Sequence, residues 1–165
     1  MANERGRRMS RWGIAPLWVV CSLLYGALVG WVQHSWLPDL TMIWPPPTVG
    51  WAMGILLIGA GLIIYVAGTR RLVRAWAEDR LETGGVYAWM RHPIYSAFIM
   101  FLVPGVVIVL RSVLGLTIPV FMYVLFRVLI RREEQYLAER FGEEYLVWRR
   151  RTSAILPAPP PESAL

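Results

Sequence analysis

Four long apolar stretches dominate the pattern of hydrophobic and polar positions along the chain. A helix that crosses a membrane needs about 20 mostly apolar residues. Each stretch comes close to that length, and together they contain a single charged side chain, Arg127 in the last of them. The pattern therefore predicts an all-α, polytopic membrane protein with about four transmembrane helices. The stretches are residues 14–33, 49–68, 93–110 and 113–130.

The connections between these stretches differ in character. Residues 37–48 contain four prolines, so this segment should be extended or turned rather than helical. Only residues 111–112 separate the last two stretches, which predicts that these two form an antiparallel helical hairpin. Pro104 and Pro119 lie inside the hairpin and predict kinks in its helices.

The last apolar stretch has no helix breaker at its inner end. Residues 131–140 continue it with good helix formers, which predicts one helix from about Leu116 to Arg140 that leaves the membrane as a cytosolic extension. Gly142 should end or bend this helix. Residues 143–151 are expected to form a short amphipathic segment at the membrane interface. The proline-rich residues 158–165 predict a disordered tail.

The composition supports a membrane protein and excludes several other classes. Hydrophobic residues make up 56% of the 165 positions and charged residues 17%, whereas soluble domains have about 25% charged residues. A disordered chain and an ordinary water-soluble enzyme are therefore excluded. The single cysteine, Cys21, cannot form an internal disulfide, which excludes a disulfide scaffold.

All 17 basic residues are arginines, and they give a net charge of +6. Such a charge could attract nucleic acid, but in so apolar a chain an anionic membrane surface is the better partner, and we expect no nucleic-acid binding. The arginines gather before residue 14, between residues 69 and 92, and after residue 130, whereas residues 34–48 contain none. The positive-inside rule then predicts that both termini are cytoplasmic, with the chain in the inner membrane if it is bacterial.

Polar side chains gather in two clusters at the same predicted membrane depth. One covers residues 83–95, and the other runs from Arg127 to Glu134. Each member has an ordinary explanation: His92 is a packed or interfacial histidine, Arg127 snorkels to the interface, and Glu133 and Glu134 form a solvated helix face. Polar groups at the edge of an apolar bundle are nevertheless costly and tend to be functional.

The ordered combination of motifs is more specific than its parts. The chain reads G-G-V-Y-A-W-M-R-H-P-I-Y, then an apolar hairpin, then R-x5-E-E-x2-L-x3-F-G-E-E-Y-L-x-W, and finally I-L-P. This order resembles the isoprenylcysteine carboxyl methyltransferase family and is similar to the related phospholipid N-methyltransferases. The resemblance covers about residues 81–157, which would be the cofactor-binding core of a single membrane domain spanning residues 1–165. Residues 1–80 would supply two N-terminal spans and a cytosolic loop.

The resemblance implies an integral membrane methyltransferase that uses S-adenosyl-L-methionine at the cytosolic membrane face. It places Gly85, Val86 and Tyr87 on the adenosine side of the cofactor. It places Arg91, His92 and Tyr95 near the methionine portion. It assigns cofactor contact to Glu133 and Glu134 and a catalytic role to Arg127 and Glu134. This chain departs from the family at one position, where Ala97 stands in place of a frequent glycine.

The chemistry of these side chains agrees with such a cofactor. The guanidinium of Arg91 can bind a carboxylate with two hydrogen bonds. A carboxylate of the acidic pair can neutralise the ammonium group, and we expect this to be Glu134, which shares a helix face with Arg127, with Glu133 more peripheral. Gly84 and Gly85 would let the backbone approach the ligand. Methyl transfer mainly needs alignment and exclusion of water, so neither a metal ion nor a covalent nucleophile is expected.

Two other function classes stay open at this point. Membrane sterol reductases that use NADPH share a similar layout of an R-H motif and an acidic pair, and a non-catalytic membrane scaffold would bind no cofactor. The methyl acceptor is also open among an isoprenylcysteine carboxylate, a lipid amine and a thiol. Gly54, Gly61 and Gly68 recur at seven-residue spacing, which predicts a close helix contact either within the chain or between chains.

Overall fold

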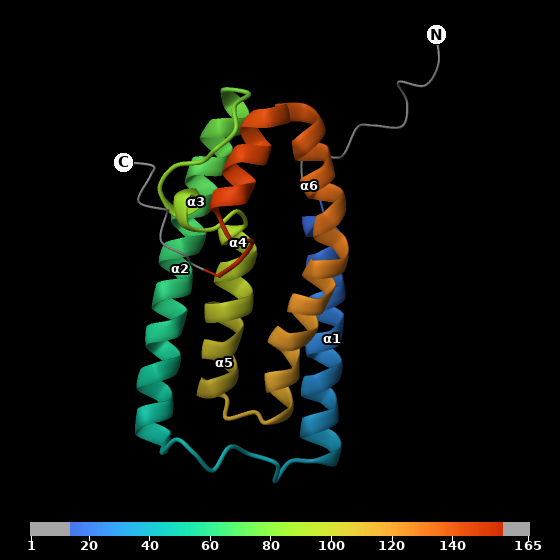
Figure 1. Cartoon of the computed structure of the whole chain (residues 1–165). Helices are drawn as coiled ribbons and strands as arrows, with labels where there is room; N and C mark the ends of the chain where they lie inside the picture. Colours follow the sequence, from blue (N-terminus) through green and yellow to red (C-terminus); the bar gives the residue numbers. More distant parts are fainter. Residues whose placement is uncertain (1–13, 157–165) are drawn as a thin grey trace, which may run out of the picture.

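The computed structural model describes residues 14–156, and this part of the chain is a bundle of long helices (Figure 1). Apart from two isolated β-bridges, the described residues form only helices and their connections, which confirms the all-α prediction. The elements are α1 (Ala15–Trp36), α2 (Pro47–Ala77), α3 (Val86–Trp89), α4 (Pro93–Ser96), the π-helix η2 (Ala97–Leu102), α5 (Val103–Val109), the 3-10 helix η3 (Leu114–Leu116) and α6 (Thr117–Arg151).

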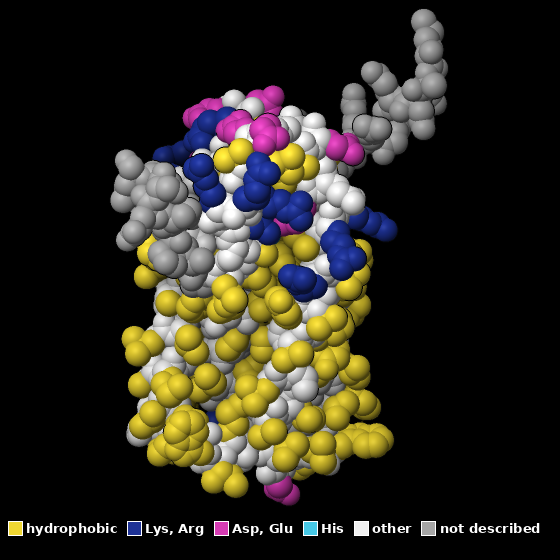
Figure 2. All heavy atoms as spheres, viewed as in Figure 1, with side chains coloured by type: hydrophobic (Ala, Val, Ile, Leu, Met, Phe, Trp, Pro, Cys, Tyr) yellow, Lys and Arg dark blue, Asp and Glu magenta, His cyan; other side chains and the backbone are white. Residues whose placement is uncertain are grey.

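Three helices of the described chain are long and apolar enough to cross a membrane: α1, α2 and the helix that contains α6. The continuous segment α4–η2–α5, Pro93–Val109, is apolar but has 17 residues, which corresponds to about 26 Å of helix against a hydrocarbon thickness of about 30 Å. On the face that Figure 2 shows, apolar side chains cover most of the bundle and most of the charged side chains gather at one end. The protein is therefore an integral membrane protein.

Helix α2 packs closely against the segment α4–η2–α5 because three glycines leave room for it. A Cβ atom at Gly54 would lie 2.7 Å from the carbonyl oxygen of Gly105, and one at Gly61 would lie 2.8 Å from Leu102. At the charged end Gly68 faces Pro93. The seven-residue glycine spacing therefore makes a contact within the chain, between α2 and the apolar hairpin.

A buried aromatic cluster joins α1 and α6 to the start of the hairpin. The rings of Trp18 and Tyr95 meet edge to face with centroids 5.1 Å apart. Tyr95 also packs against Phe126, which is fully buried. The indole N–H of Trp18 donates a hydrogen bond to the backbone carbonyl of Met122, 2.9 Å away. These contacts fix the start of α4, and with it the motif that precedes it.

The hairpin forms as predicted, but its irregular points differ from those expected. Residues 110–116 join α5 to α6, so the connection is longer than the two polar residues between the apolar stretches. The π-helix η2 precedes Pro104, and π-helical turns are a recognised cause of helix kinks. Pro119 lies in the first turn of α6, where proline is tolerated, so it does not interrupt the middle of a span.

The connection from α1 to α2 and the end of α6 also follow the sequence pattern. Residues 37–46 are not helical, and α2 begins at Pro47, a position that suits proline. Helix α6 runs past Arg140 to Gly142, whose φ of 56° and ψ of −131° break it. Residues 143–151 then fold back toward α3 and α4 (Figure 1). The predicted tail at 158–165 and the arginines before residue 14 lie outside the described residues.

We expect Gly54→Ala to destabilise the bundle by about 1–3 kcal/mol, because the added methyl group overlaps Val109 and the Gly105 carbonyl. Gly59→Ala in the same helix is the control, since a Cβ atom there meets nothing within 4 Å. The control should be neutral or stabilising by up to about 1 kcal/mol. Unfolding free energies in mixed micelles measure both, and equal values would contradict the close packing.

Candidate functional site

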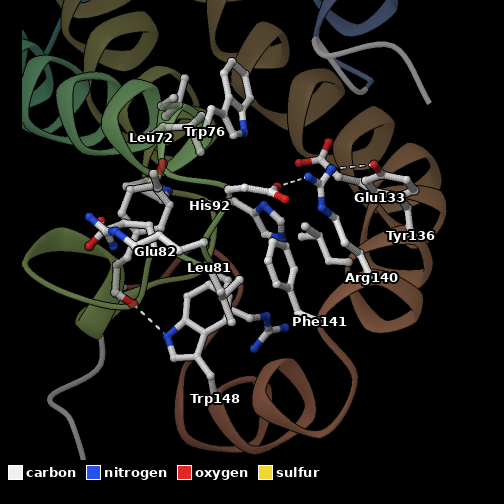
Figure 3. A pocket seen from close by; sticks show the side chains of 18 of the residues that line it. Leu72, Trp76, Leu81, Glu82, His92, Glu133, Tyr136, Arg140, Phe141 and Trp148 are labelled. Carbon is white, nitrogen blue, oxygen red and sulfur yellow. Dashed lines mark hydrogen bonds and ion pairs between the residues drawn. The ribbon is translucent and has the colours of Figure 1, made fainter. Parts of the chain in front are cut away.

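A cavity of about 520 Å³ lies at the charged end of the bundle (Figure 3). Its lining comes from the inner ends of α2 and α6, the loop after α2, the turn before α4, and the segment that follows Gly142. The loop and the segment bring together residues far apart in sequence. The residues that line the cavity include Leu72, Trp76, Glu82, Tyr87, Arg91, His92, Tyr95, Glu133, Tyr136, Arg140 and Trp148.

The turn before α4 is held by the chain that follows α6. The backbone N–H groups of Arg91 and His92 donate to the carbonyls of Ser153 and Ala154, at 2.9 and 3.0 Å. The hydroxyl of Ser96 donates to the carbonyl of Ile155, 2.8 Å away. This explains the spacing between the R-H-P motif and the terminal I-L-P motif, because the two pair side by side.

Glu134 is the centre of a buried ionic cluster beside the cavity. Both Nε and Nη2 of Arg91 donate to its Oε1, at 3.1 and 3.0 Å. His92 Nε2 lies 3.6 Å from the same oxygen, and Arg149 Nη2 lies 3.1 Å from Oε2. Glu134 is the more buried of the two adjacent glutamates, whereas the sequence-based prediction was that it is the one that meets the ligand. Its charge is balanced by these partners, and it does not line the cavity.

Of the two adjacent glutamates, Glu133 is the one that lines the cavity. Adjacent residues on a helix point about 100° apart, so Glu133 and Glu134 lie in different environments. The Oε2 atom of Glu133 is buried and has no hydrogen-bond partner in the described structure. A buried carboxylate oxygen without a partner is costly, so this atom is available to a ligand.

The glycine pair packs against an arginine rather than against the cavity. Gly85 has a φ of 57°, and a Cβ atom there would lie 2.4 Å from Nε of Arg71. Neither Gly85 nor Val86 lines the cavity, whereas Tyr87 does. The Tyr87 hydroxyl lies 3.4 Å from the carbonyl of Gly68, its hydrogen-bond acceptor, and burial raises the pKa of this hydroxyl. The pair therefore shapes the loop that presents Tyr87.

The carboxylate of Glu82 organises the same loop. It accepts hydrogen bonds from the Gly84 N–H at 2.9 Å, from Arg80 at 2.8 Å and from Arg71 at 3.2 Å. Burial opposes its ionisation, but these donors outweigh burial and lower the pKa of the carboxyl. Glu82 is therefore charged at neutral pH and neutralised by its partners at the cavity wall.

Arg127 lies away from the cavity, contrary to the expected inward face. Its neighbour Phe126 is buried in the core, and adjacent side chains point about 100° apart, so Arg127 is exposed on the outer surface of α6. The buried positions at this level are Met122, Phe126 and Ile130, spaced by four. Glu134 continues this four-residue spacing, so it lies on the buried face of α6. Arg127 does not belong to that series, although it is seven residues from Glu134.

Several cavity residues were not singled out from the sequence. Trp76 and Leu72 lie on one side of the cavity and Trp148 on the opposite side (Figure 3). The indole N–H of Trp148 donates to the carbonyl of Tyr87, 3.1 Å away. Tyr136 and Arg140 line the α6 side, and Arg140 pairs with Asp79 across the loop after α2. Only Trp148 lay within a recognised motif.

These features define an integral membrane protein with a cavity where its spanning helices meet the charged end. The chain belongs to the isoprenylcysteine carboxyl methyltransferase (ICMT) family, whose model matches residues 56–139, slightly more than half of the chain. No solved structure matches it.

Curated relatives carry the same name. Protein-S-isoprenylcysteine O-methyltransferase B of Arabidopsis thaliana is 30% identical over 132 residues, which cover 78% of this chain and 63% of that protein. The enzyme of Rattus norvegicus is 29% identical over 143 residues, 79% of this chain and 49% of that protein. That of Saccharomyces cerevisiae is 36% identical over 82 residues, 49% and 34% of the two chains. This chain therefore spans only a third to two thirds of these relatives.

We expect Glu134→Ala to destabilise the folded C-terminal segment by about 2–4 kcal/mol, because it leaves the buried guanidinium of Arg91 without its carboxylate. Trypsin should then cleave faster after Arg149–Arg151. Glu143→Ala is the control, because its pair with Arg150 is exposed and worth less than about 1 kcal/mol. Equal cleavage rates in the two variants would show that Glu134 does not hold this segment.

Proposed function

We propose that the protein is an integral membrane methyltransferase that uses S-adenosyl-L-methionine and acts on a lipophilic acceptor. Membership of the ICMT family supports this activity. The single observation that carries the proposal is the unpartnered, buried carboxylate oxygen of Glu133 in a cavity at the charged end of the bundle. No side chain or backbone group within residues 14–156 forms a hydrogen bond with this atom, and a cationic ligand group would supply one.

The cavity fits the proposed cofactor in size and chemistry. Its volume of about 520 Å³ lies within the range of small-molecule sites. Glu133 would meet the α-ammonium group, and the rings of Tyr87, Tyr95 and Trp148 would offer aromatic faces to the adenine or the sulfonium. When bound, the cofactor supplies an electrophilic methyl group to the acceptor.

The remaining site residues would act by holding this cavity in shape. Arg91 and His92 line the cavity and contact Glu134, which Arg149 pairs from the other side. We therefore assign Glu134 a positioning role and place the direct charge contact on Glu133. Arg91 keeps its proposed place near the methionine portion, with its guanidinium oriented by Glu134. Methyl transfer requires that the methyl donor and the acceptor are aligned and that water is excluded, and a rigid cavity wall meets both requirements.

The acceptor is proposed to be an isoprenylcysteine carboxylate that reaches the cavity from the membrane. The relatives are named for isoprenylcysteine, and membrane-spanning helices α2 and α6 both line the cavity. A carboxylate needs no general base to accept a methyl group, which agrees with a site built for positioning. Lipid amines and small thiols are the other acceptors that the assay below includes.

The decisive experiment is methyl transfer by the purified protein in lipid nanodiscs. Labelled S-adenosyl-L-methionine is offered with N-acetyl-S-farnesylcysteine, with extracted phospholipids or with small thiols. We expect label in a base-labile ester of the farnesylated acceptor. Binding of NADPH without binding of S-adenosyl-L-methionine would overturn the proposal in favour of a reductase, and binding of neither would favour a scaffold.

Glu133→Gln should weaken binding of S-adenosyl-L-methionine by about 10- to 150-fold, the loss expected for a hydrogen bond to a charged group. The change keeps the shape of the side chain and removes its charge. Glu144→Gln, on the exposed surface after Gly142, is the control and should leave the Kd unchanged. Calorimetric titration measures both, and an unchanged Kd in Glu133→Gln would remove Glu133 from the cofactor site.

The charged end of the bundle is proposed to face the cytosol, in line with the arginine distribution. In a Cys21→Ala background, Asp39→Cys at one end and Glu78→Cys at the other are both exposed. An impermeant maleimide added outside intact cells should label the cysteine at position 39 and not the one at position 78. The reverse pattern would invert the orientation.

A further inference from the structure

The two helices that flank the cavity give it chemically different walls. Helix α6 contributes the polar Glu133, Tyr136 and Arg140 beside apolar residues, whereas every lining residue from α2 is apolar, including Leu72, Ala75 and Trp76. A ligand with a polar end and an apolar end would therefore place its charges against α6 and its hydrocarbon against α2. Figure 3 shows Leu72 and Trp76 together on one side of the cavity, across from Trp148.

The α2 wall continues into a stripe of exposed apolar side chains. Leu62, Val66, Val73 and Trp76 follow the spacing of one helix face. Their exposed fractions are 49, 40, 55 and 50%. Trp76 is the last of them and also lines the cavity, so its indole lies where the exposed apolar stripe meets the cavity. Tyr87, the aromatic residue on the loop side, is buried and does not share this exposure.

We propose that Trp76, supported by Leu72, receives the hydrocarbon chain of the acceptor and selects for its length. This inference rests on the proposed methyltransferase function and names a residue for its acceptor side. The chain would enter along the Leu62–Val66–Val73 stripe, pass the indole, and leave the reacting group at the polar wall. Removal of apolar contact surface weakens binding in proportion to the area lost.

The chain offers a matched control for this tryptophan. Trp89 lies in α3 at the same end of the bundle and is 47% exposed, almost the same as Trp76, but it does not line the cavity. A general effect of removing an interfacial tryptophan should therefore appear in both variants. A specific effect on the acceptor should appear only at Trp76.

The test compares Trp76→Ala, Trp76→Phe and Trp89→Ala in nanodiscs with geranyl, farnesyl and geranylgeranyl cysteine acceptors. Trp76→Ala should raise the KM for the farnesyl acceptor about ten-fold and flatten the dependence on chain length, while the KM for S-adenosyl-L-methionine stays unchanged. Trp76→Phe should restore part of the loss, and Trp89→Ala should match the wild type. An equal rise in the cofactor KM, or the same loss in Trp89→Ala, would overturn the proposal.

A binding readout separates this proposal from the activity itself. A farnesylcysteine carrying a diazirine at the end of its chain is irradiated with the wild-type protein, and labelled peptides are mapped. We expect label on the α2 peptide that contains Leu72 and Trp76. Label confined to other helices would overturn the role of Trp76 even if methyl transfer is observed. Label at Trp76 without any methyl transfer would retain the acceptor site and reject the enzymatic function.

Discussion

The ionic cluster around Glu134 is the interaction on which the arrangement of the site depends. Its carboxylate, on α6, forms ion pairs with Arg91, which precedes α4, and with Arg149, which lies beyond the bend at Gly142. A buried carboxylate without these cations would be unstable. The pairs therefore require the segment after Gly142 to fold back, and that fold places Trp148 at the wall of the cavity.

The same requirement explains why two acidic residues stand side by side. A single glutamate could either bind the cluster or face the cavity, because a helix turns about 100° between adjacent residues. Glu134 is neutralised by the chain, so its charge is already satisfied. Glu133 keeps a buried oxygen without a partner. One member of the pair thus stabilises the walls, and the other presents a carboxylate oxygen without a hydrogen-bond partner to the cavity.

The sequence predicted the helices better than the faces they present. Apolar length identified the spanning segments, and Gly142 marked the bend, because both depend on local composition and on a backbone that favours glycine. The predicted inward orientation of Arg127 was wrong, because it was inferred from the position of Arg127 near the inner edge of its span and from its seven-residue spacing to Glu134. Which side of a helix is buried depends on neighbours such as Tyr95 and Phe98, which no local pattern reports.

The glycines of α2 show the same limit and also why the site lies where it does. Their spacing predicted a close helix contact but did not identify the partner. The partner is the hairpin segment that carries the R-H-P motif. Gly68 meets Pro93 at the charged end, so the close approach of the two helices continues up to the first residue of α4. Beyond that point α2 continues without glycine, and its larger side chains Leu72 and Trp76 line the open space. The cavity therefore begins where the glycines of α2 end, at the charged end of the bundle.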